Sequence, residues 1–287
     1  MIRAIALALI AALAACAAPT PRPQVAPRGT LELFDNRLYL PATVNGSAAR
    51  ALLDSGAELS VLDDDFAARL GLPLTGQATA HGSGAAAMQA RFARDATIAA
   101  AGVRLPGRTV AVLDLGEVSA RLIGRPIDMI LGRDLFDAGR MRIVVQAGRI
   151  AMVARDAEPA GVRLALTGAR GIETFPVRVE GHGSVPAVFD LGNGSEVLVG
   201  RAFARRTGIA NPDRIVERRA GGGLGGSVER DIVLLRSVLI AGVPFRNVPA
   251  AIDDSPSAAD LNIGTQLLRR FLITTDFPQR AIWLEPR

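Results

Sequence analysis

Short apolar runs separated by turn residues make up most of the chain, and two of these runs end on an aspartate. In the first half, "RLYLPATVNGSAARALLDSG" (37–56) predicts a strand, a turn at Asn45-Gly46 and a second strand that stops at Asp54, since Asn-Gly is a strong hairpin signal. In the second half, "TFPVRVEGHGSVPAVFDLG" (174–192) predicts the same order and stops at Asp190. An ionised carboxylate is costly to bury unless it is paired or functional. Both acids are therefore candidate functional residues.

The likeness between the halves continues beyond the two aspartates in the same order. Each acid is followed by a short amphipathic helix, a glycine-rich stretch, a strand-turn-strand segment, and an apolar run to Gly132 or Gly264 that precedes a helix and a closing hairpin. Five features in one order indicate an internal repeat. Because most segments are short, apolar and bounded by turns, each half is predicted to be mainly β. We expect a first lobe at 31–155 and a second, divergent lobe at 156–287.

The N-terminus has the pattern of an export signal. Residues 1–15 give a cationic start and an apolar run too short to span a bilayer, followed by small residues. Together with Cys16 they resemble the bacterial lipobox, in which the cysteine is lipidated and becomes the first mature residue. The alternative is an ordinary signal peptide with a chance cysteine. Residues 16–30, rich in Pro and Ala, are then an extended tether from the lipid.

Composition argues against disulfide bonds and against binding to nucleic acid. Cys16 is the only cysteine, so no disulfide can form within the chain. The net charge of +5 suggests nucleic acid as a possible class of partner. However, the arginines are scattered and only 4% of residues are aromatic, so no series of rings for stacking bases is present. We expect no binding to nucleic acid.

Two segments of the first half resemble the retropepsin-like aspartic proteases. They are Asp54-Ser55-Gly56-Ala57 and, about 75 residues later, Ile130-Leu131-Gly132-Arg133-Asp134. Members of this family carry a D-T/S-G-A loop at the end of a strand, a glycine-tipped flap hairpin, and an apolar I-L-G sequence before a helix. The resemblance implies an all-β fold of two tandem retropepsin-like lobes related by a pseudo-twofold axis.

The second half resembles the same unit with departures. In Asp190-Leu191-Gly192-Asn193, Leu191 replaces Ser55 and Asn193 replaces Ala57, and Asn262-Ile263-Gly264 stands in for the I-L-G run. Leu191 has no hydroxyl group. In this family the hydroxyl at that position helps lock the two loops together through reciprocal hydrogen bonds.

The resemblance implies an aspartic endopeptidase that needs no metal or cofactor. Asp54 and Asp190 would share one proton and activate a water that attacks a peptide or protein substrate. Ser55, Gly56, Ala57, Leu191 and Gly192 would form the active-site loops. Two glycine-rich flaps would close over the substrate, and their residues are Gly82, Ser83, Gly84, Gly222, Gly223 and Gly225.

Three arrangements remain open from the sequence. The first is a monomer whose lobes pair within the chain. The second is a dimer in which Asp54 faces Asp54 of another chain. The third is a non-catalytic lipoprotein of the envelope that binds extended peptides or a partner in the same cleft. For all of them we expect a periplasm-facing lipoprotein, and because Ala17 is not an acid, family analogy points to the outer membrane.

A glycine-rich motif and two histidines do not indicate a nucleotide or metal site. Residues 221–226 satisfy G-x-G-x-x-G by letter but lack the preceding apolar strand and following helix of a dinucleotide site, so we predict a hairpin tip there. His81 and His182 are isolated and lie next to glycines, which favours solvated turn residues over metal ligands.

Overall fold

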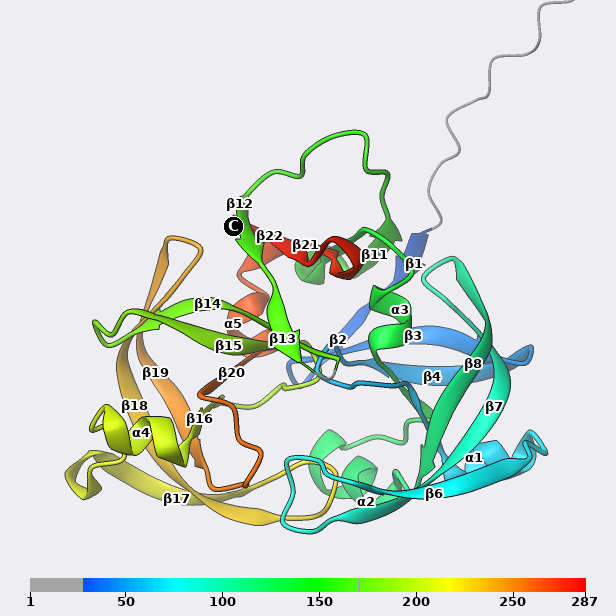
Figure 1. The fold of residues 1–287 in the computed structure, drawn as a ribbon, viewed down its shortest axis with the longest axis horizontal. Coiled ribbons are helices and arrows are strands. Elements are labelled where there is room, and N and C mark those ends of the chain that lie inside the picture. The colour runs from blue at the N-terminus through cyan, green and yellow to red at the C-terminus, as the bar shows by residue number, and fades with distance from the viewer. Residues whose placement is uncertain (1–27, 170) are drawn as a thin grey trace, which may run out of the picture.

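The computed structural model describes residues 28–169 and 171–287 and consists mainly of β-strands in three sheets (Figure 1). Cys16, the expected signal peptide and residues 16–27 of the expected tether lie outside the described residues. The predicted all-β, two-lobe fold class is confirmed. Within the described ranges, no helix is long and apolar enough to cross a bilayer.

The first lobe is an eight-stranded sheet with the order β2-β3-β4-β9-β5-β8-β7-β6. Its strands are β2 (Glu32–Phe34), β3 (Arg37–Val44), β4 (Ser47–Leu53), β5 (Val61–Asp63), β6 (Leu74–Ala80), β7 (Met88–Ala100), β8 (Val103–Leu113) and β9 (Met129–Leu131). Its helices are α1 (Asp64–Arg69), α2 (Gly116–Val118), the π-helix η1 (Ser119–Ile123) and α3 (Arg133–Phe136). Along β4, exposure alternates at the hairpin end and gives way to continuous burial at Ala51–Leu53, as expected where a strand is covered on both faces.

The second lobe repeats this arrangement with the order β13-β14-β15-β20-β16-β19-β18-β17. Its strands are β13 (Thr167–Ala169), β14 (Ile172–Val179), β15 (Ser184–Asp190), β16 (Val197–Gly200), β17 (Ile215–Gly221), β18 (Val228–Ile240), β19 (Val243–Asp253) and β20 (Leu261–Gly264). Its helices are α4 (Arg201–Arg206), η3 (Pro212–Arg214) and α5 (Thr265–Leu268). In both lobes the strand that ends at the aspartate pairs in parallel with the strand that ends at the late glycine, as β4 with β9 and β15 with β20.

The third sheet joins the two lobes and has the order β1-β11-β10-β21-β22-β12. Its elements are β1 (Arg28–Thr30), β10 (Met141–Val144), β11 (Arg149–Met152), β12 (Val162–Ala165), β21 (Phe271–Asp276) and β22 (Ala281–Pro286), with the short helices η2 (Val145–Ala147) and η4 (Phe277–Gln279). The two predicted closing hairpins, β10–β11 and β21–β22, meet where Ile143 pairs with Ile273 across the seam. Figure 1 shows this sheet above the lobes, with the flaps at the opposite edge.

Strand β1 and the joining sheet bear on the two domain limits expected from the sequence. Residues 28–30, assigned to the end of the tether, form strand β1, because their backbone pairs with β11 from Arg149 to Ala151. The joining sheet therefore begins within the last three residues of the expected tether. The division between residues 155 and 156 stays a prediction, since segments from both sides of it share the joining sheet.

Aromatic packing makes the lobes one folded unit. Phe277 of η4 stacks on Phe136 of the first lobe with ring centroids 4.9 Å apart, and meets Phe189 of the second lobe edge-on at 6.4 Å. All three rings are buried. Because one cluster of buried side chains runs through both lobes, the apolar surface of neither lobe is covered without the other.

A buried carboxylate fastens the joining sheet to the segment between the lobes. Asp276, which is fully buried, accepts hydrogen bonds from Arg140 Nε at 3.1 Å and from Arg155 Nε and Nη2 at 2.8 and 2.6 Å. Burial by itself raises the pKa of Asp276, but the hydrogen bonds from Arg155 and Arg140 outweigh it and lower the pKa below its ordinary value. The folded protein therefore holds this group ionised.

Replacing Asp276→Ala should lower the free energy of unfolding by about 3 to 5 kcal/mol, because it leaves the buried charge of Arg140 without a partner. Arg155→Ala should cost less, since its side chain is 42% exposed. The Asp276 contribution is present above the unfolded pKa of about 3.9 and is lost as pH falls through the lowered folded pKa. Urea denaturation of both variants and the wild type at pH 7 and pH 3 measures this. Equal losses for Asp276→Ala and Arg155→Ala would contradict it.

Candidate functional site

The two aspartates lie face to face where β4 and β15 end. The backbone N–H of Asp54 still donates to Leu131 O at 3.0 Å, so the strand pairing extends to the acid itself. A side-chain carbon added at Gly56 would lie 3.0 Å from Asp190 Cγ, and one added at Gly192 would lie 2.6 Å from Asp54 Oδ2. Each acid thus packs on the glycine of the opposite loop, and any larger residue at position 192 would displace Asp54.

The hydrogen bonds around the two carboxyl groups differ. Asp54 Oδ1 accepts from the N–H of Gly56 at 2.8 Å. Asp190 Oδ1 accepts from the N–H groups of Gly192 and Asn193 at 2.9 and 3.0 Å, and its Oδ2 accepts from Asn262 Nδ2 at 2.7 Å. The site is built from similar loops but is not symmetric.

Burial is the main reason that the pKa of Asp54 is raised well above its ordinary value, followed by the charge of the neighbouring Asp190. A hydrogen bond between the two side chains adds to the rise, and backbone N–H groups at Gly56 and Ala57 oppose it. Two adjacent carboxylates cannot both ionise readily, so such a pair holds one proton over a range of pH. This arrangement provides a base and an acid side by side.

Ser55 ties the two loops together from one side. Its hydroxyl, fully buried, donates to Phe189 O at 2.7 Å and accepts from the N–H of Leu191 at 2.9 Å. The reciprocal hydroxyl is absent because Leu191 occupies that position with a fully buried apolar side chain. Thr265 instead donates to Leu191 O at 2.9 Å. The cross-loop hydrogen bonds expected to be reciprocal are therefore made by Ser55 alone.

Two residues of the site, Asn193 and Asn262, are not among the site residues predicted from the sequence. In the sequence, Asn193 replaces Ala57 of the first half, and Asn262 replaces an apolar residue of the late apolar run. Asn262 occupies in β20 the position that Ile130 occupies in β9, opposite the strand that ends at the aspartate. An amide at an otherwise apolar position beside a carboxylate was the signal that could have found it.

The glycine-rich segments form the tips of two hairpins, β6–β7 and β17–β18, and the tips touch. Gly84 N donates to Leu224 O at 2.9 Å and Ala86 N to Gly225 O at 2.8 Å. Gly222 and Gly225 have φ of +90° and +93°, which side chains other than hydrogen rarely adopt. The predicted residues Gly82, Ser83, Gly84, Gly222, Gly223 and Gly225 all lie in this contact. The prediction that residues 221–226 form a hairpin tip is confirmed by the positions of β17 and β18.

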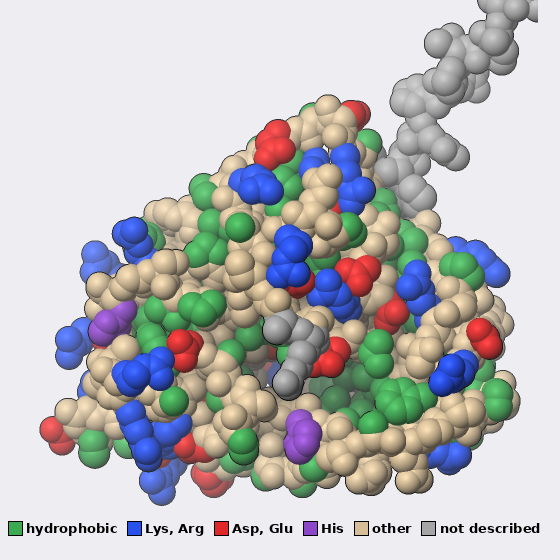
Figure 2. Space-filling view, viewed as in Figure 1, with side chains coloured by type: hydrophobic (Ala, Val, Ile, Leu, Met, Phe, Trp, Pro, Cys, Tyr) green, Lys and Arg blue, Asp and Glu red, His purple; other side chains and the backbone are tan. Residues whose placement is uncertain are grey.

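Arginines from opposite lobes hold the paired tips. Arg121 of η1 donates from Nη2 to Gly223 O at 2.8 Å and from Nη1 to Gly221 O at 3.3 Å. Arg230 of β18 donates to Ser83 O at 2.6 Å. Figure 1 shows the two hairpins meeting at the edge opposite the joining sheet, and Figure 2 shows the surface hollowed between the lobes. The structure therefore presents the flaps in a closed arrangement.

The wall of the first lobe beside Asp54 is apolar. A separate cluster of side chains includes Tyr39, Ile130 and Leu115, and the partly buried Ala57 and Met88 pack on it. Leu224, from the flap of the second lobe, also packs on this cluster. The residues of this wall that an extended chain lying over the aspartates would meet are the partly buried ones, Ala57, Met88 and Leu224.

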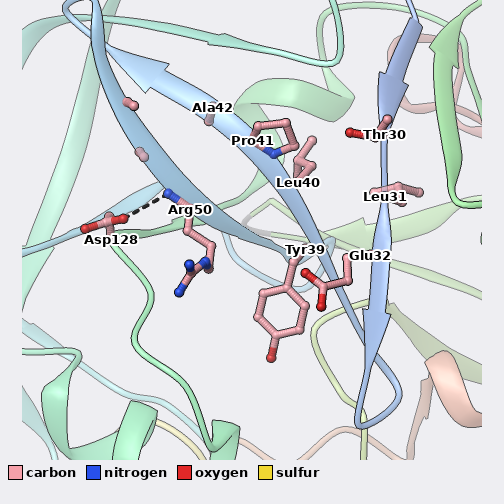
Figure 3. Close-up of a pocket in the computed structure, with 11 residues that line it drawn as sticks. Thr30, Leu31, Glu32, Tyr39, Leu40, Pro41, Ala42, Arg50 and Asp128 are labelled. Carbon is pink, nitrogen blue, oxygen red and sulfur yellow. Dashed lines mark hydrogen bonds between the residues drawn. The ribbon is translucent and has the colours of Figure 1, made fainter.

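A cavity in the part of the chain that the structure describes lies away from the two aspartates. It has a volume of about 460 Å³ and lies between β1–β2 and the β3–β4 hairpin (Figure 3). At one side of the cavity the backbone N–H of Arg50 donates to Asp128 at 2.9 Å and the Arg50 guanidinium donates to Pro126 O. It contains neither aspartate of the site.

A group of three acids could in principle hold a cation. The carboxylates of Asp63, Asp64 and Asp114 lie within 4.8 Å of one another. However, Asp63 caps α1 by accepting from Phe66 N, and also accepts from Leu115 N. Its oxygens have structural partners, so this group is explained by helix capping.

Comparison with known proteins agrees with this geometry. Residues 40–135 match the aspartyl protease family, over about a third of the 287 residues and across both Asp54 and Gly132. The match supports an aspartyl protease family and, at that level, a peptidase that acts on peptide substrates. No curated protein matches the chain.

Removing the bridging hydroxyl with Ser55→Ala should reduce stability by about 1 to 3 kcal/mol, because Phe189 O and Leu191 N lose their partner in a buried site. Ser55→Thr retains the hydroxyl and is the matched control. Thermal unfolding of the three proteins measures the effect. A Ser55→Ala protein as stable as the wild type would show that the cross-loop hydrogen bonds contribute nothing.

Proposed function

We propose that the protein is an aspartic endopeptidase whose two aspartates, Asp54 and Asp190, come from the two lobes of one chain. The observation that carries the proposal is the approach of each carboxyl group to the opposite loop's glycine, which leaves the two acids adjacent. The raised pKa of Asp54 supports it, since a shared proton requires that one acid stay protonated when the other is ionised.

The chemistry follows from this pair. The ionised carboxylate takes a proton from a water placed between the acids, and the resulting hydroxide attacks the peptide carbonyl carbon. The protonated carboxyl group donates its proton to the carbonyl oxygen as charge develops there. The closed flaps offer backbone groups along an extended substrate, and the partly buried apolar residues Ala57, Met88 and Leu224 favour apolar side chains.

Two other arrangements have less support. A dimer with Asp54 facing Asp54 would require the lobes to separate, although they share the joining sheet and the Phe136–Phe277 stack. A non-catalytic binder of extended peptides would fit the departures at Leu191 and Asn193. The variants below distinguish both from the intramolecular pair.

We also propose that the protein is a lipoprotein of the bacterial envelope, facing the periplasm from the outer membrane. The support is the sequence of residues 1–17 alone, with a signal-like run, a small-small-Cys ending and no acid at position 17. The lipid on Cys16 would then hold the peptidase at the membrane through the tether.

Asp54→Asn and Asp190→Asn should each abolish cleavage of extended apolar peptides while leaving the fold intact, since neither acid alone supplies both base and acid. The double variant should be no worse than either single one.

Wild-type activity should fall as pH rises through the raised pKa of Asp54, because both acids then ionise. Turnover of a peptide library across pH, for all four proteins, is the measurement.

Distinct outcomes would reject this proposal. Cleavage that survives in Asp190→Asn but not in Asp54→Asn would indicate Asp54 from two chains. Peptide that binds to the wild type without being cut at any pH would indicate the non-catalytic binder.

The lipoprotein proposal predicts that the exported protein begins at Cys16 and carries acyl chains there, and that Cys16→Ser removes it from the membrane fraction. Mass spectrometry of the mature N-terminus and fractionation of both forms test this. A soluble mature wild type that begins at another residue would end the proposal.

A further inference from the structure

We propose that Asn262, oriented by Asn193, keeps Asp190 as the ionised member of the pair and leaves the shared proton on Asp54. The inference rests on the proposed function and deepens it, because it assigns the base and the acid to particular lobes. Asn262 acts through Asp190 and is a positioning residue.

The orientation of both amides follows from one backbone donor. The N–H of Ser195 donates to Asn193 Oδ1 at 2.9 Å, and a backbone N–H can be satisfied only by an acceptor. Asn193 must therefore turn its Nδ2 the other way, where it donates to Glu196 O at 3.1 Å and to Asn262 Oδ1 at 2.9 Å. With its oxygen engaged, Asn262 has only its Nδ2 to offer to Asp190.

This chain of hydrogen bonds decides where a proton can sit. Asn262 Nδ2 donates to Asp190 Oδ2 at 2.7 Å, so that oxygen must accept and cannot carry a proton in this direction. If Asn262 rotated its amide to accept a proton from Asp190, its Nδ2 would face Asn193 Nδ2, donor against donor. The other oxygen, Oδ1, already accepts from Gly192 and Asn193. Three donors on Asp190 favour its charged form.

Asp54 lacks this support. Ile130, the counterpart of Asn262, is a buried apolar residue in β9 and offers no donor. Burial and the charge of Asp190 both favour the protonated form of Asp54, and only backbone N–H groups oppose it. The two lobes therefore divide the roles of base and acid between them.

The other charged groups near Asp190 are held by partners of their own. Glu196, at the end of the same loop, pairs with Arg219. Arg37, which packs on Gly194 from the first position of β3 and donates to Ser195 Oγ, pairs with Asp35. Across the site, Asp190 faces Asp54, and Asp190 is the one charged group among the main causes of the raised pKa of Asp54.

The proton balance over a turnover is closed. Asp190 takes a proton from water as the C–O bond forms, while the Asp54 proton passes to the carbonyl oxygen, giving a neutral diol. Asp190 then gives its proton to the leaving nitrogen as the C–N bond breaks, and Asp54 takes a proton from one diol hydroxyl. The products leave with Asp54 protonated and Asp190 ionised, which is the starting state.

The test uses Asn262→Ile, which copies Ile130 of the first lobe, with Ile130→Leu as the matched control. Because a hydrogen bond to a charge is lost, the acid limb of the kcat/KM profile should move up by about one to two pH units in Asn262→Ile. Asn193→Ala should move it in the same direction by less. Ile130→Leu should leave the position of the limb unchanged, whatever it does to the rate. A merely structural role for Asn262 would lower activity without moving the limb.

A second readout does not require cleavage. The ¹³Cγ signals of Asp54 and Asp190 in the full chain, assigned with Asp54→Asn and Asp190→Asn, should titrate with Asp190 ionising first, and Asn262→Ile should raise the pH at which it does so. A wild type in which Asp54 ionises first, or an Asn262→Ile protein with unchanged titration and acid limb, would overturn the inference. If no peptide is cut, the proposed function fails, and the carboxyl titration still decides the proton assignment.

Discussion

The close approach of two strand ends governs the rest of this structure. Asp54 and Asp190 can be adjacent only because Gly56 and Gly192 leave room for the opposite carboxyl group. Holding the ends there requires Ser55 to bond across the gap and the joining sheet to fix the lobes. Since adjacent carboxyl groups resist double ionisation, this geometric constraint is also the source of the site's proton chemistry.

The surroundings of the pair make two similar acids chemically different. The second lobe has Leu191 where the first lobe has the cross-loop hydroxyl of Ser55, and it also has two amides, Asn193 and Asn262, that the first lobe lacks. These differences between the lobes lie close together. Leu191 is next to Asp190, whose carboxyl group accepts hydrogen bonds from Gly192, Asn193 and Asn262.

The sequence was sufficient for much of this picture. The apolar runs, the Asn45-Gly46 turn and the ordered repeat led to two β lobes, and the strand-ending aspartates identified the candidate acids. The pairing between the two closing hairpins could not be predicted from the sequence, because Ile143 and Ile273, which pair across the joining sheet, are far apart along the chain. The role of Asn262 was also hidden, since its partner Asn193 lies 69 residues away and only the fold brings their amides together.

Fusion of both lobes in one chain has a consequence for how such a site can change. In a dimer of identical chains, every substitution appears twice and the two halves of the site must remain alike. Here the joining sheet makes the two halves separately encoded parts of one molecule. A mutation can alter the surroundings of one acid and spare the other, and Leu191, Asn193 and Asn262 are found on one side only.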